Sequence, residues 1–175
     1  LLVASALETA ALGPNAAFDF PNFSKFDDVP VSNTLVSSIS INQMVELGDS
    51  IVQEIRTTYP DVQVEGGVAR NEMSVNMVNS AGGYFHYDKT TFGFGFEATL
   101  IRGEDMLFVH DGRSSVEPFF EIDETLNSIF RQLEWAKSSA SIKTKQMPVI
   151  FLPSAVPSVI ISPIVSALSG KSVLF

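Results

Sequence analysis

Apolar and polar positions along the chain follow two different periods, and the first is helical. Between residues 41 and 55, apolar side chains recur every three or four residues, which is the spacing of a helix with one buried face. Ser40 and Gln43 have the form of a capping box at its start, and Tyr59-Pro60 favours its end. The pattern therefore predicts an amphipathic helix from about residue 41 to residue 59.

A period of two follows, which is typical of β-strands. Between residues 92 and 100, large apolar side chains alternate with glycine, glutamate and threonine, so we expect a strand with one buried face. Shorter alternations at residues 62–64 and 73–77 predict further strands, and we interpret Glu65-Gly66-Gly67 between them as a bend.

Two glycine-containing turns divide the strand region further. Ala81-Gly82-Gly83 and Arg102-Gly103-Glu104-Asp105 have compositions that are typical of turns, and residues 106–110 form another strand-like segment. We therefore expect three to five antiparallel strands that form a curved sheet.

A proline-rich connector is expected before the first amphipathic helix. Residues 15–30 carry prolines within and beside them, which predicts an extended segment rather than a regular element. The phenylalanines of this segment are predicted to act as hydrophobic anchors: Phe18, Phe20, Phe23 and Phe26.

A second amphipathic helix is expected after the strands. It begins at Asp123 or the residue before it, and it is followed by a polar, basic linker at residues 138–146. Its predicted buried stripe consists of Leu126, Ile129, Phe130 and Leu133, with Ala136 as a candidate last member.

The last part of the chain is apolar. Pro148–Pro153 is predicted to be a short buried strand, and a helix is predicted from Ser154 to Leu168, with Gly170 as its C′ residue. The fold class is therefore α+β: a mostly antiparallel curved sheet with packed amphipathic helices, ending in a strand and a helix that begin the next domain.

Both ends of the chain have the character of cut segments. Residues 1–7 resemble the tail of a helix, and residues 171–175 end within an apolar run. We expect an internal fragment of a longer protein. Residues 1–145 are interpreted as part of an N-terminal α/β domain, and residues 146–175 as a linker strand and helix that lead into a C-terminal domain.

Composition excludes several classes of protein. The 175 residues are 45% hydrophobic, which is too apolar for a disordered chain, yet no run of them resembles a membrane-spanning helix. The net charge of −9, with scattered lysines and arginines, argues against partners such as nucleic acid or an anionic membrane. The chain has no cysteine, which excludes disulfides and thiolate zinc ligands within it and fits a reducing compartment.

Two histidines lie beside carboxylates. The segment Phe85-His86-Tyr87-Asp88 could line a substrate groove with its aromatic faces, so His86, Tyr87 and Asp88 are candidate groove residues. Because an imidazole next to a carboxylate is also part of a hydrolytic triad, a metal-independent hydrolase that uses His86 is a further hypothesis. His110 beside Asp111 is a second pair of this kind. We expect no bound zinc, unless the two histidines converge across the sheet with a carboxylate.

Four segments, in order, resemble the TldD/PmbA family. Residues 148–153 resemble its "PVIF-x-P" strand, and residues 162–173 resemble a helix that ends in "ALSG-x-SV". Upstream, Asn79–Gly82 resembles the family's "NS-x-G" turn, and Asp111–Ser114 falls where family chains carry a similar stretch. The order and the intervals agree from about residue 35 to residue 175.

The resemblance implies a bacterial or archaeal cytoplasmic zinc peptidase system, a TldD/TldE (PmbA) heterodimer that degrades or trims small unfolded polypeptides in an enclosed cavity. The family has also been labelled "modulator of DNA gyrase". In TldD-type chains the helix after the "PV" strand carries His-Glu-x-x-x-His, in which two histidines bind zinc and the glutamate polarises water. Here Ser162, Pro163 and Ala167 occupy those positions, so the resemblance is to the metal-free PmbA/TldE subunit.

The expected role is therefore that of a non-catalytic subunit, with no cofactor in this chain and zinc in a TldD-like partner. The expected partners are a TldD-like subunit or a second copy of the chain, together with an unfolded peptide substrate. The alternative is a peptide-binding or scaffold module without peptidase activity, because exposed strands can accept an added peptide strand through main-chain hydrogen bonds.

Overall fold

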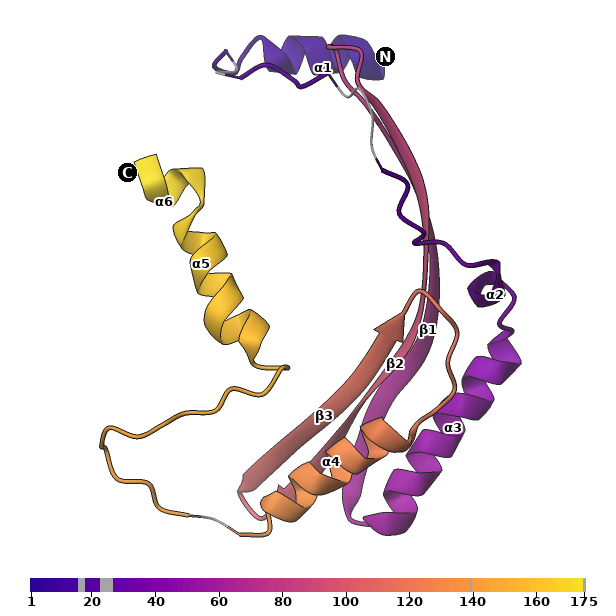
Figure 1. The fold of residues 1–175 in the computed structure, drawn as a ribbon, viewed down its shortest axis with the longest axis vertical. Coiled ribbons are helices and arrows are strands. Elements are labelled where there is room, and N and C mark those ends of the chain that lie inside the picture. Colours follow the sequence, from indigo (N-terminus) through magenta and orange to yellow (C-terminus); the bar gives the residue numbers. More distant parts are fainter. Residues whose placement is uncertain (16–17, 23–26, 139, 175) are drawn as a thin grey trace. The chain divides into compact units, whose positions relative to one another are not determined.

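The computed structural model describes residues 1–15, 18–22, 27–138 and 140–174. The chain divides into two compact units, Leu1–Ser138 and Ser139–Phe175, which are described separately. The first unit holds the sheet and the amphipathic helices, and the second holds the apolar C-terminal helical segment (Figure 1).

Helix α3 (Ile41–Thr58) has the start and the end that the sequence predicts. The Ser40 hydroxyl accepts a hydrogen bond from the backbone N–H of Gln43 at 3.2 Å, and the Gln43 side chain accepts one from the backbone N–H of Ser40 at 2.9 Å. This reciprocal pair satisfies two backbone donors that the first turn leaves without helical partners. Tyr59 is the C-cap, because Pro60 disfavours helical geometry at the residue before it.

Three antiparallel strands form one sheet in the order β1-β2-β3 (Figure 1). They are β1 (Val62–Val78), β2 (Tyr84–Arg102) and β3 (Asp105–Ser115). The expected α+β fold with a curved antiparallel sheet is thus confirmed, with three strands described. Strand β2 is the central strand, but it is paired on both sides only from Phe92 onwards, because β3 ends opposite that residue.

The expected bend at Glu65-Gly66-Gly67 is wrong, because β1 runs through these residues without interruption. Gly66 lies opposite Phe96 of β2, and a Cβ atom at Gly66 would meet the Phe96 ring at 2.5 Å. The glycine therefore makes room for an aromatic ring on the neighbouring strand rather than reversing the chain. The two predicted turns are present, and Gly82 and Gly103 have positive φ angles of 83° and 66°.

The core lies between one face of the sheet and helices α3 and α4 (Asp123–Trp135), which are drawn on the same side of the sheet in Figure 1. Every second residue of β2 points to this face, as the alternating sequence predicts. The buried apolar side chains come from β2 (Phe92, Phe94, Phe96, Ala98), α3 (Leu47, Ile51, Ile55), α4 (Leu126, Ile129, Leu133), Val36, Ile39, Val62, Val109 and Phe119.

The N-terminal part of the unit contains helix α1 (Leu2–Ala10) and the short helix α2 (Thr34–Ser37). Helix α1 agrees with the helical character of residues 1–7, and it has no buried side chain. The described parts of the connector are irregular, as expected. Phe18 and Phe20 do not anchor it, because they are 67% and 54% exposed; Phe23 and Phe26 lie outside the described residues.

The second unit differs from the prediction at two places. Pro148–Pro153 forms no strand, and the described residues of its unit contain no strand with which it could pair. The helical stretch consists of a π-helical turn η1 (Pro157–Ile161) that continues into α5 (Ser162–Ala167). Gly170 is not a C′ residue, because it lacks the left-handed conformation and instead begins α6 (Gly170–Leu174).

The ends of α3 and α4 are joined by an exposed polar cluster of Tyr59, Glu134 and Lys137. The Tyr59 hydroxyl donates to the Glu134 carboxylate, which also pairs with the Lys137 ammonium. The hydrogen bond to Glu134, followed by desolvation and the negative charge of Glu134, raises the pKa of Tyr59 to about 12. The hydrogen bonds from Lys137 and Tyr59 lower the pKa of Glu134.

We expect the Glu134→Gln substitution to lower the pKa of Tyr59 from about 12 towards its ordinary value of 10.0, because the charged acceptor is removed. The measurement is the ultraviolet absorbance of tyrosinate against pH, with the curve of Tyr59→Phe subtracted to isolate Tyr59. Since the folded pKa of Tyr59 is raised, the stability that this shift contributes is complete below pH 10 and decreases as pH rises through about 12. Glu124→Gln, on the same helix, is the control; an equal shift in that variant would contradict the assignment.

Candidate functional site

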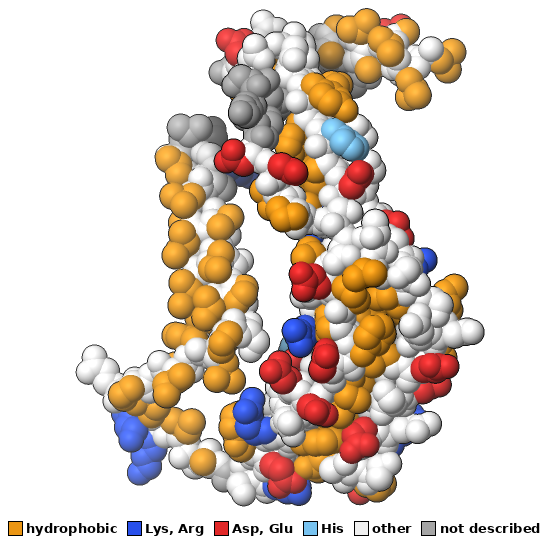
Figure 2. Space-filling view, turned by 45° about the vertical axis from the view of Figure 1, so that its right-hand side comes forward, with side chains coloured by type: hydrophobic (Ala, Val, Ile, Leu, Met, Phe, Trp, Pro, Cys, Tyr) orange, Lys and Arg blue, Asp and Glu red, His pale blue; other side chains and the backbone are white. Residues whose placement is uncertain are grey.

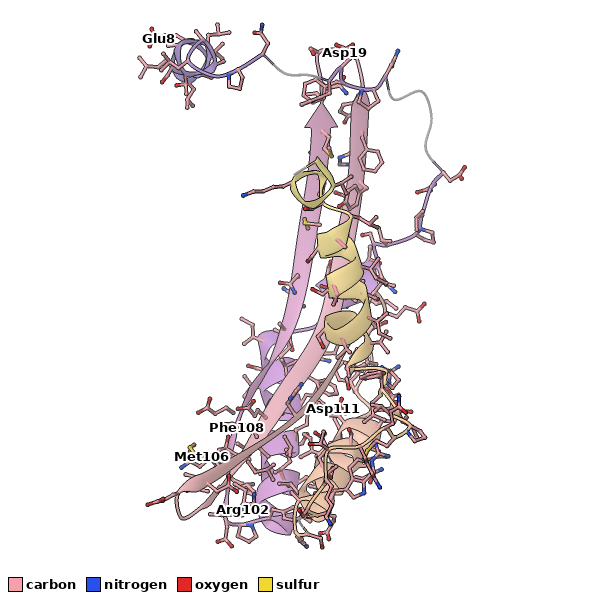
Figure 3. All side chains as sticks on the ribbon, turned by 90° about the vertical axis from the view of Figure 1, so that its left-hand side faces the viewer. Glu8, Asp19, Arg102, Met106, Phe108 and Asp111 are labelled. Carbon is pink, nitrogen blue, oxygen red and sulfur yellow. The ribbon has the colours of Figure 1, made fainter. Side chains whose placement is uncertain are left out.

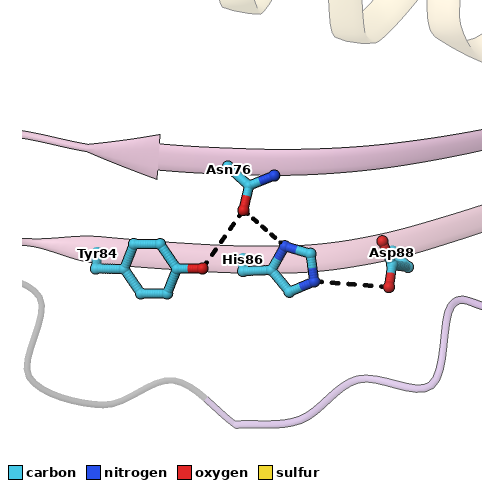
Figure 4. Close-up of polar contacts among 4 residues, drawn as sticks. All are labelled: Asn76, Tyr84, His86 and Asp88. Atoms are coloured by element: carbon cyan, nitrogen blue, oxygen red, sulfur yellow. Dashed lines mark hydrogen bonds and ion pairs between the residues drawn. The ribbon is translucent and has the colours of Figure 1, made fainter.

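The candidate groove residues lie in the part of β2 that extends past β3. His86 lies opposite Asn76 of β1, and Asp88 is two residues further along the same face of β2. The Nδ1–H of His86 donates to Asn76 Oδ1 at 2.9 Å, and His86 Nε2 lies 3.6 Å from Asp88 Oδ2 (Figure 4). The Tyr84 hydroxyl makes a long hydrogen bond of 3.4 Å to the same Asn76 oxygen.

This arrangement holds an imidazole between an amide and a carboxylate, but it is not a hydrolytic triad. A triad needs a hydroxyl or thiol hydrogen-bonded to the imidazole. Within the described part of the chain, no serine or threonine hydroxyl makes that contact with His86; its partners are Asn76 and Asp88. The His86 and Asp88 side chains are 41% and 59% exposed, so their ion pair contributes at most about 1 kcal/mol. The geometry gives the hydrolase hypothesis no support.

Strand alternation divides the four-residue segment between two faces. His86 and Asp88 share the face of Phe92, whereas Phe85 and Tyr87 point to the opposite face, where their ring centroids are 5.3 Å apart. The segment therefore does not present one continuous aromatic face, although its members remain neighbours along one strand edge.

A cavity of about 490 Å³ lies along that edge, between β2 and the connector. It is lined by Tyr84, Phe85, His86 and Tyr87 of β2, and by Asp27, Asp28, Val29 and Val31 of the connector. Asp88 lies just outside this lining. Among the described lining residues, Asp27 and Asp28 carry carboxylates, and acidic side chains (red) are also scattered over the surface seen in Figure 2. Of the sequence-predicted groove residues, the structure thus brings His86 and Tyr87 to the same cavity.

The two histidines do not converge. His86 pairs with Asn76, whereas His110 of β3 lies opposite Glu97 of β2. His86 and Glu97 are eleven positions apart on β2, which corresponds to roughly 35 Å along the strand. His110 also points to the sheet face opposite the one on which α3 and α4 pack. Gln132 of α4 donates only to the main-chain oxygen of His110, at 3.1 Å.

A row of titratable side chains that the sequence analysis missed crosses this face. Glu65, Glu97 and His110 lie directly opposite one another on β1, β2 and β3, and they line a cavity of about 550 Å³. The next row consists of Gly67, Gly95 and Gly112. Beyond His110, β3 presents Phe108 and Met106 (Figure 3). Only the register of the ladder reveals these rows, because their members are far apart in the sequence.

The sequence resemblance predicts that the segment equivalent to a zinc-binding helix is residues 162–167, and the structure places these residues in α5. Ser162, Pro163 and Ala167 lie at its start and end. Zinc in proteins is bound by imidazole, thiolate or carboxylate groups, and this helix offers none of them. Over the described ranges, no three His, Asp or Glu side chains are grouped as metal ligands. The residues present at α5 therefore do not fit a zinc ion.

Comparison with known proteins gives one informative result. No protein-family model matches the sequence, and no curated protein matches it. Among solved structures, TldE from Thermococcus kodakarensis is similar, with a TM-score of 0.61 over 78% of this chain. Over this span, the chain has the fold of the matching part of TldE. The sequence identity is 17%, and the chain spans about a third of the TldE chain, 32% of its length.

The TldE fold confirms, at the level of structure, the resemblance to a TldE/PmbA-type fragment that the sequence motifs indicate. In the described part of this TldE-like chain, none of the helices combines the length and the apolar character that crossing a membrane requires.

Proposed function

We propose that this chain is the non-catalytic, TldE-like subunit of a TldD/TldE-type zinc peptidase system that acts on small unfolded polypeptides. The observation that carries the proposal is the fold shared with TldE. In this proposal the chain helps to form the chamber in which a TldD-like partner cleaves its substrate, and the cleavage contributes to proteolysis or peptide maturation.

The residues of α5 support a division of labour between the two subunits. A zinc peptidase requires metal ligands and a base that activates water. Ser162, Pro163 and Ala167 supply neither, so the proposal assigns the zinc to the partner, whose corresponding helix carries His-Glu-x-x-x-His. In this proposal the chain helps to form the chamber and contacts the substrate, whereas the partner carries out the cleavage.

The proposed location is the cytoplasm, which agrees with a chain that has no cysteine. The net charge of −9 gives no support to direct contact with DNA, despite the gyrase label attached to the family. The proposal therefore names a protein partner and a peptide substrate, and no nucleic acid.

The proposal is tested by co-expression of the full-length protein with a TldD-like chain that carries His-Glu-x-x-x-His. We expect a stable heteromeric complex by size-exclusion chromatography, with peptidase activity that a chelator abolishes and that zinc restores. The control complex contains a partner in which the histidines of His-Glu-x-x-x-His are replaced by alanine; it should assemble but lack activity. Absence of any complex, or activity that survives in the control, would refute the proposal.

A second candidate function is peptide binding or scaffolding without any peptidase partner. The cavity of about 490 Å³ between β2 and the connector favours it, because that cavity belongs to this chain alone. The two candidates differ in one measurement: a scaffold binds peptide but forms no complex with the TldD-like chain.

A further inference from the structure

Strand β1 lies at one side of the sheet along its whole length. The strand order β1-β2-β3 gives it one neighbour, and all of its residues from Val62 to Val78 pair with β2. The side of a strand that has no neighbour presents a row of main-chain N–H and C=O groups, which is a template for pairing with another chain. With 17 residues, β1 offers a long template.

The direction of these main-chain groups follows from one hydrogen bond. The backbone N–H of Thr90 in β2 donates to the carbonyl oxygen of Val31 at 3.0 Å, so it points away from β1. Glu72 lies directly opposite Thr90, and residues directly opposite in an antiparallel ladder point either both towards or both away from each other. The main-chain groups of Glu72 therefore point to the outer edge of β1. By alternation, the residues in the middle of β1 that point this way are Val68, Arg70, Glu72 and Ser74.

These outward groups have no hydrogen-bond partner in the described chain. Apart from the ladder with β2, the described residues make one main-chain hydrogen bond to β1, from the N–H of Val62 to the carbonyl oxygen of Tyr59 at 3.3 Å. The connector contacts the other side of the β1–β2 ribbon, where Val31 bonds to Thr90. The segment of β1 from Val68 to Ser74 is therefore open to a further strand.

Helix α3 leaves space beside this edge. A cavity of about 340 Å³ lies between α3 and β1, and both Gly66 and Gly67 line it. Successive residues of a strand point to opposite faces, so a cavity that both of them line reaches the edge of the strand. On the helix side it is lined by Ile41 and Val45, which are 70% and 54% exposed. A strand added at this edge would cover part of that apolar surface.

Two opposite charges lie in the middle of the open segment. Arg70 and Glu72 are two positions apart, so both side chains are on the face of the sheet that α3 covers. The ion pairs over the described ranges are His86–Asp88, Arg102–Asp105 and Glu134–Lys137, so neither charge has an opposite partner there.

The Arg70 side chain is held in place at this edge. Its Nη1 donates to the carbonyl oxygens of Ser37 and Ile39, which fixes the guanidinium group. A guanidinium group has five N–H donors on three nitrogens, so Nη2 and Nε can still donate to a carboxylate.

The sequence of this segment is complementary to itself in one antiparallel register. When two copies of β1 pair with Asn71 at the centre, Arg70 of each copy lies opposite Glu72 of the other. A shift of one residue in either direction places Arg70 opposite itself or Glu72 opposite itself, and like charges directly opposite one another are destabilising. The charges therefore favour a second copy of the chain, paired about Asn71, as the occupant of this edge.

We propose that the outer edge of β1 binds the same edge of a second copy of the chain, so that two three-stranded sheets form one continuous sheet. The main chains of Arg70 and Val68 pair with those of Glu72 and Ser74 of the second copy. Asn71 faces its own counterpart on the two-fold axis. The contact is isologous, the kind that closes a symmetric dimer.

This inference goes beyond the proposed function, because it concerns association of the chain with itself. Its test uses this chain alone, so that its failure and the failure of the heteromeric complex are separate results. A dimer without a TldD-like complex would support the inference and refute the peptidase proposal. A heteromeric complex formed by a chain that is monomeric by itself would do the reverse.

The first test is a disulfide at the centre of the contact. The 175-residue chain has no cysteine, so an introduced thiol has no other thiol of the chain to pair with except that of the second copy. Asn71 and its counterpart form a pair without mutual hydrogen bonds, whose Cα atoms are about 4.5 Å apart, within the range that a disulfide spans. We expect Asn71→Cys to form a covalent dimer on mild oxidation, measured by non-reducing electrophoresis.

Ala69→Cys and Met73→Cys are the matched controls, since both residues are exposed and lie on the same face of β1 as Asn71. In the proposed register Ala69 faces Met73 of the second copy, and each is about 13 Å along the strand from its own counterpart. Neither variant alone should form the covalent dimer. An equimolar mixture of the two should form it.

The second test reverses one charge. Glu72→Arg places a cation opposite Arg70 at both symmetric positions, so we expect the Kd of the dimer to rise at least about tenfold. Glu65→Arg makes the same change of charge on β1 outside the segment from Val68 to Ser74, and it should leave the Kd within about threefold. The measurement is sedimentation equilibrium at about 0.15 M salt, where charges beyond about 8 Å are screened. Circular dichroism verifies the fold of each variant.

Equal disulfide formation by Asn71→Cys, Ala69→Cys and Met73→Cys would overturn the inference, even if Glu72→Arg failed to fold. The same Kd for Glu72→Arg and Glu65→Arg, with the fold retained, would also overturn it. If the edge pairs only with a TldD-like chain, this chain by itself should be a monomer and Asn71→Cys should stay uncrosslinked, which contradicts the proposal.

Discussion

The Phe92→Ala substitution is expected to destabilise the first unit by about 3–5 kcal/mol, the usual range for removal of a buried aromatic side chain. Phe92 is fully buried, and its ring lies 5.5 Å from that of Phe119 and 5.6 Å from that of Phe120. Its removal therefore leaves a cavity where β2 meets the segment between β3 and α4. The measurement is urea denaturation followed by circular dichroism.

The matched control is Phe108→Ala on β3 of the same sheet. Phe108 is 54% exposed, so its truncation removes little buried area and should change the free energy of unfolding by less than about 1 kcal/mol. A similar loss in both variants would show that Phe92 does not occupy a well-packed core.

The second large effect is expected from Gly66→Ala. A Cβ atom at this position would collide with the carbonyl oxygen of Gly95 and would approach two ring carbons of Phe96 at 2.5 and 2.7 Å. The carbonyl belongs to the β1–β2 ladder and cannot move without weakening it. Overpacking of this kind costs typically about 1–3 kcal/mol, and we expect the upper end because a backbone atom is involved.

Gly67→Ala is the control for this substitution, one residue away. A Cβ atom at Gly67 would meet nothing within 4 Å, so the variant should be neutral or slightly more stable, by up to about 1 kcal/mol. Thermal unfolding of the two variants compares them directly. Equal melting temperatures would contradict the packing role of Gly66.

The sequence predicts much of this fold because its local signals agree with the tertiary packing. The Ser40 and Gln43 capping box, the helical stripe of α3 and the alternation of β2 each specify one element and its buried face. The glycine turns also predict where the strands reverse. Glu65-Gly66-Gly67 was misinterpreted because a glycine pair looks the same in a bend as beside a large ring on the next strand.

The candidate site was less predictable than the fold. The sequence places His86, Tyr87 and Asp88 together, but alternation along β2 divides them between two faces. The cavity depends on how the connector at Asp27–Val31 passes β2, and no local pattern encodes that path. For Pro148–Pro153, apolar character indicated a strand, but a strand also needs a neighbour, and its described unit contains none.

The β1–β2 hairpin also sets an order of events during folding. The pair Val78–Tyr84 joins residues close in sequence, whereas Val62–Leu100 closes nearly the whole hairpin. The local end forms fastest but is marginal by itself, because it is a two-stranded ribbon far from the apolar core. The stabilising contacts lie at the Val62–Leu100 end of the hairpin, where the entropic cost of closing the chain is greatest. We therefore expect folding to be limited by the step that brings β2 onto α3 and α4, and the ribbon between Asn76 and His86 to become stable only after that step.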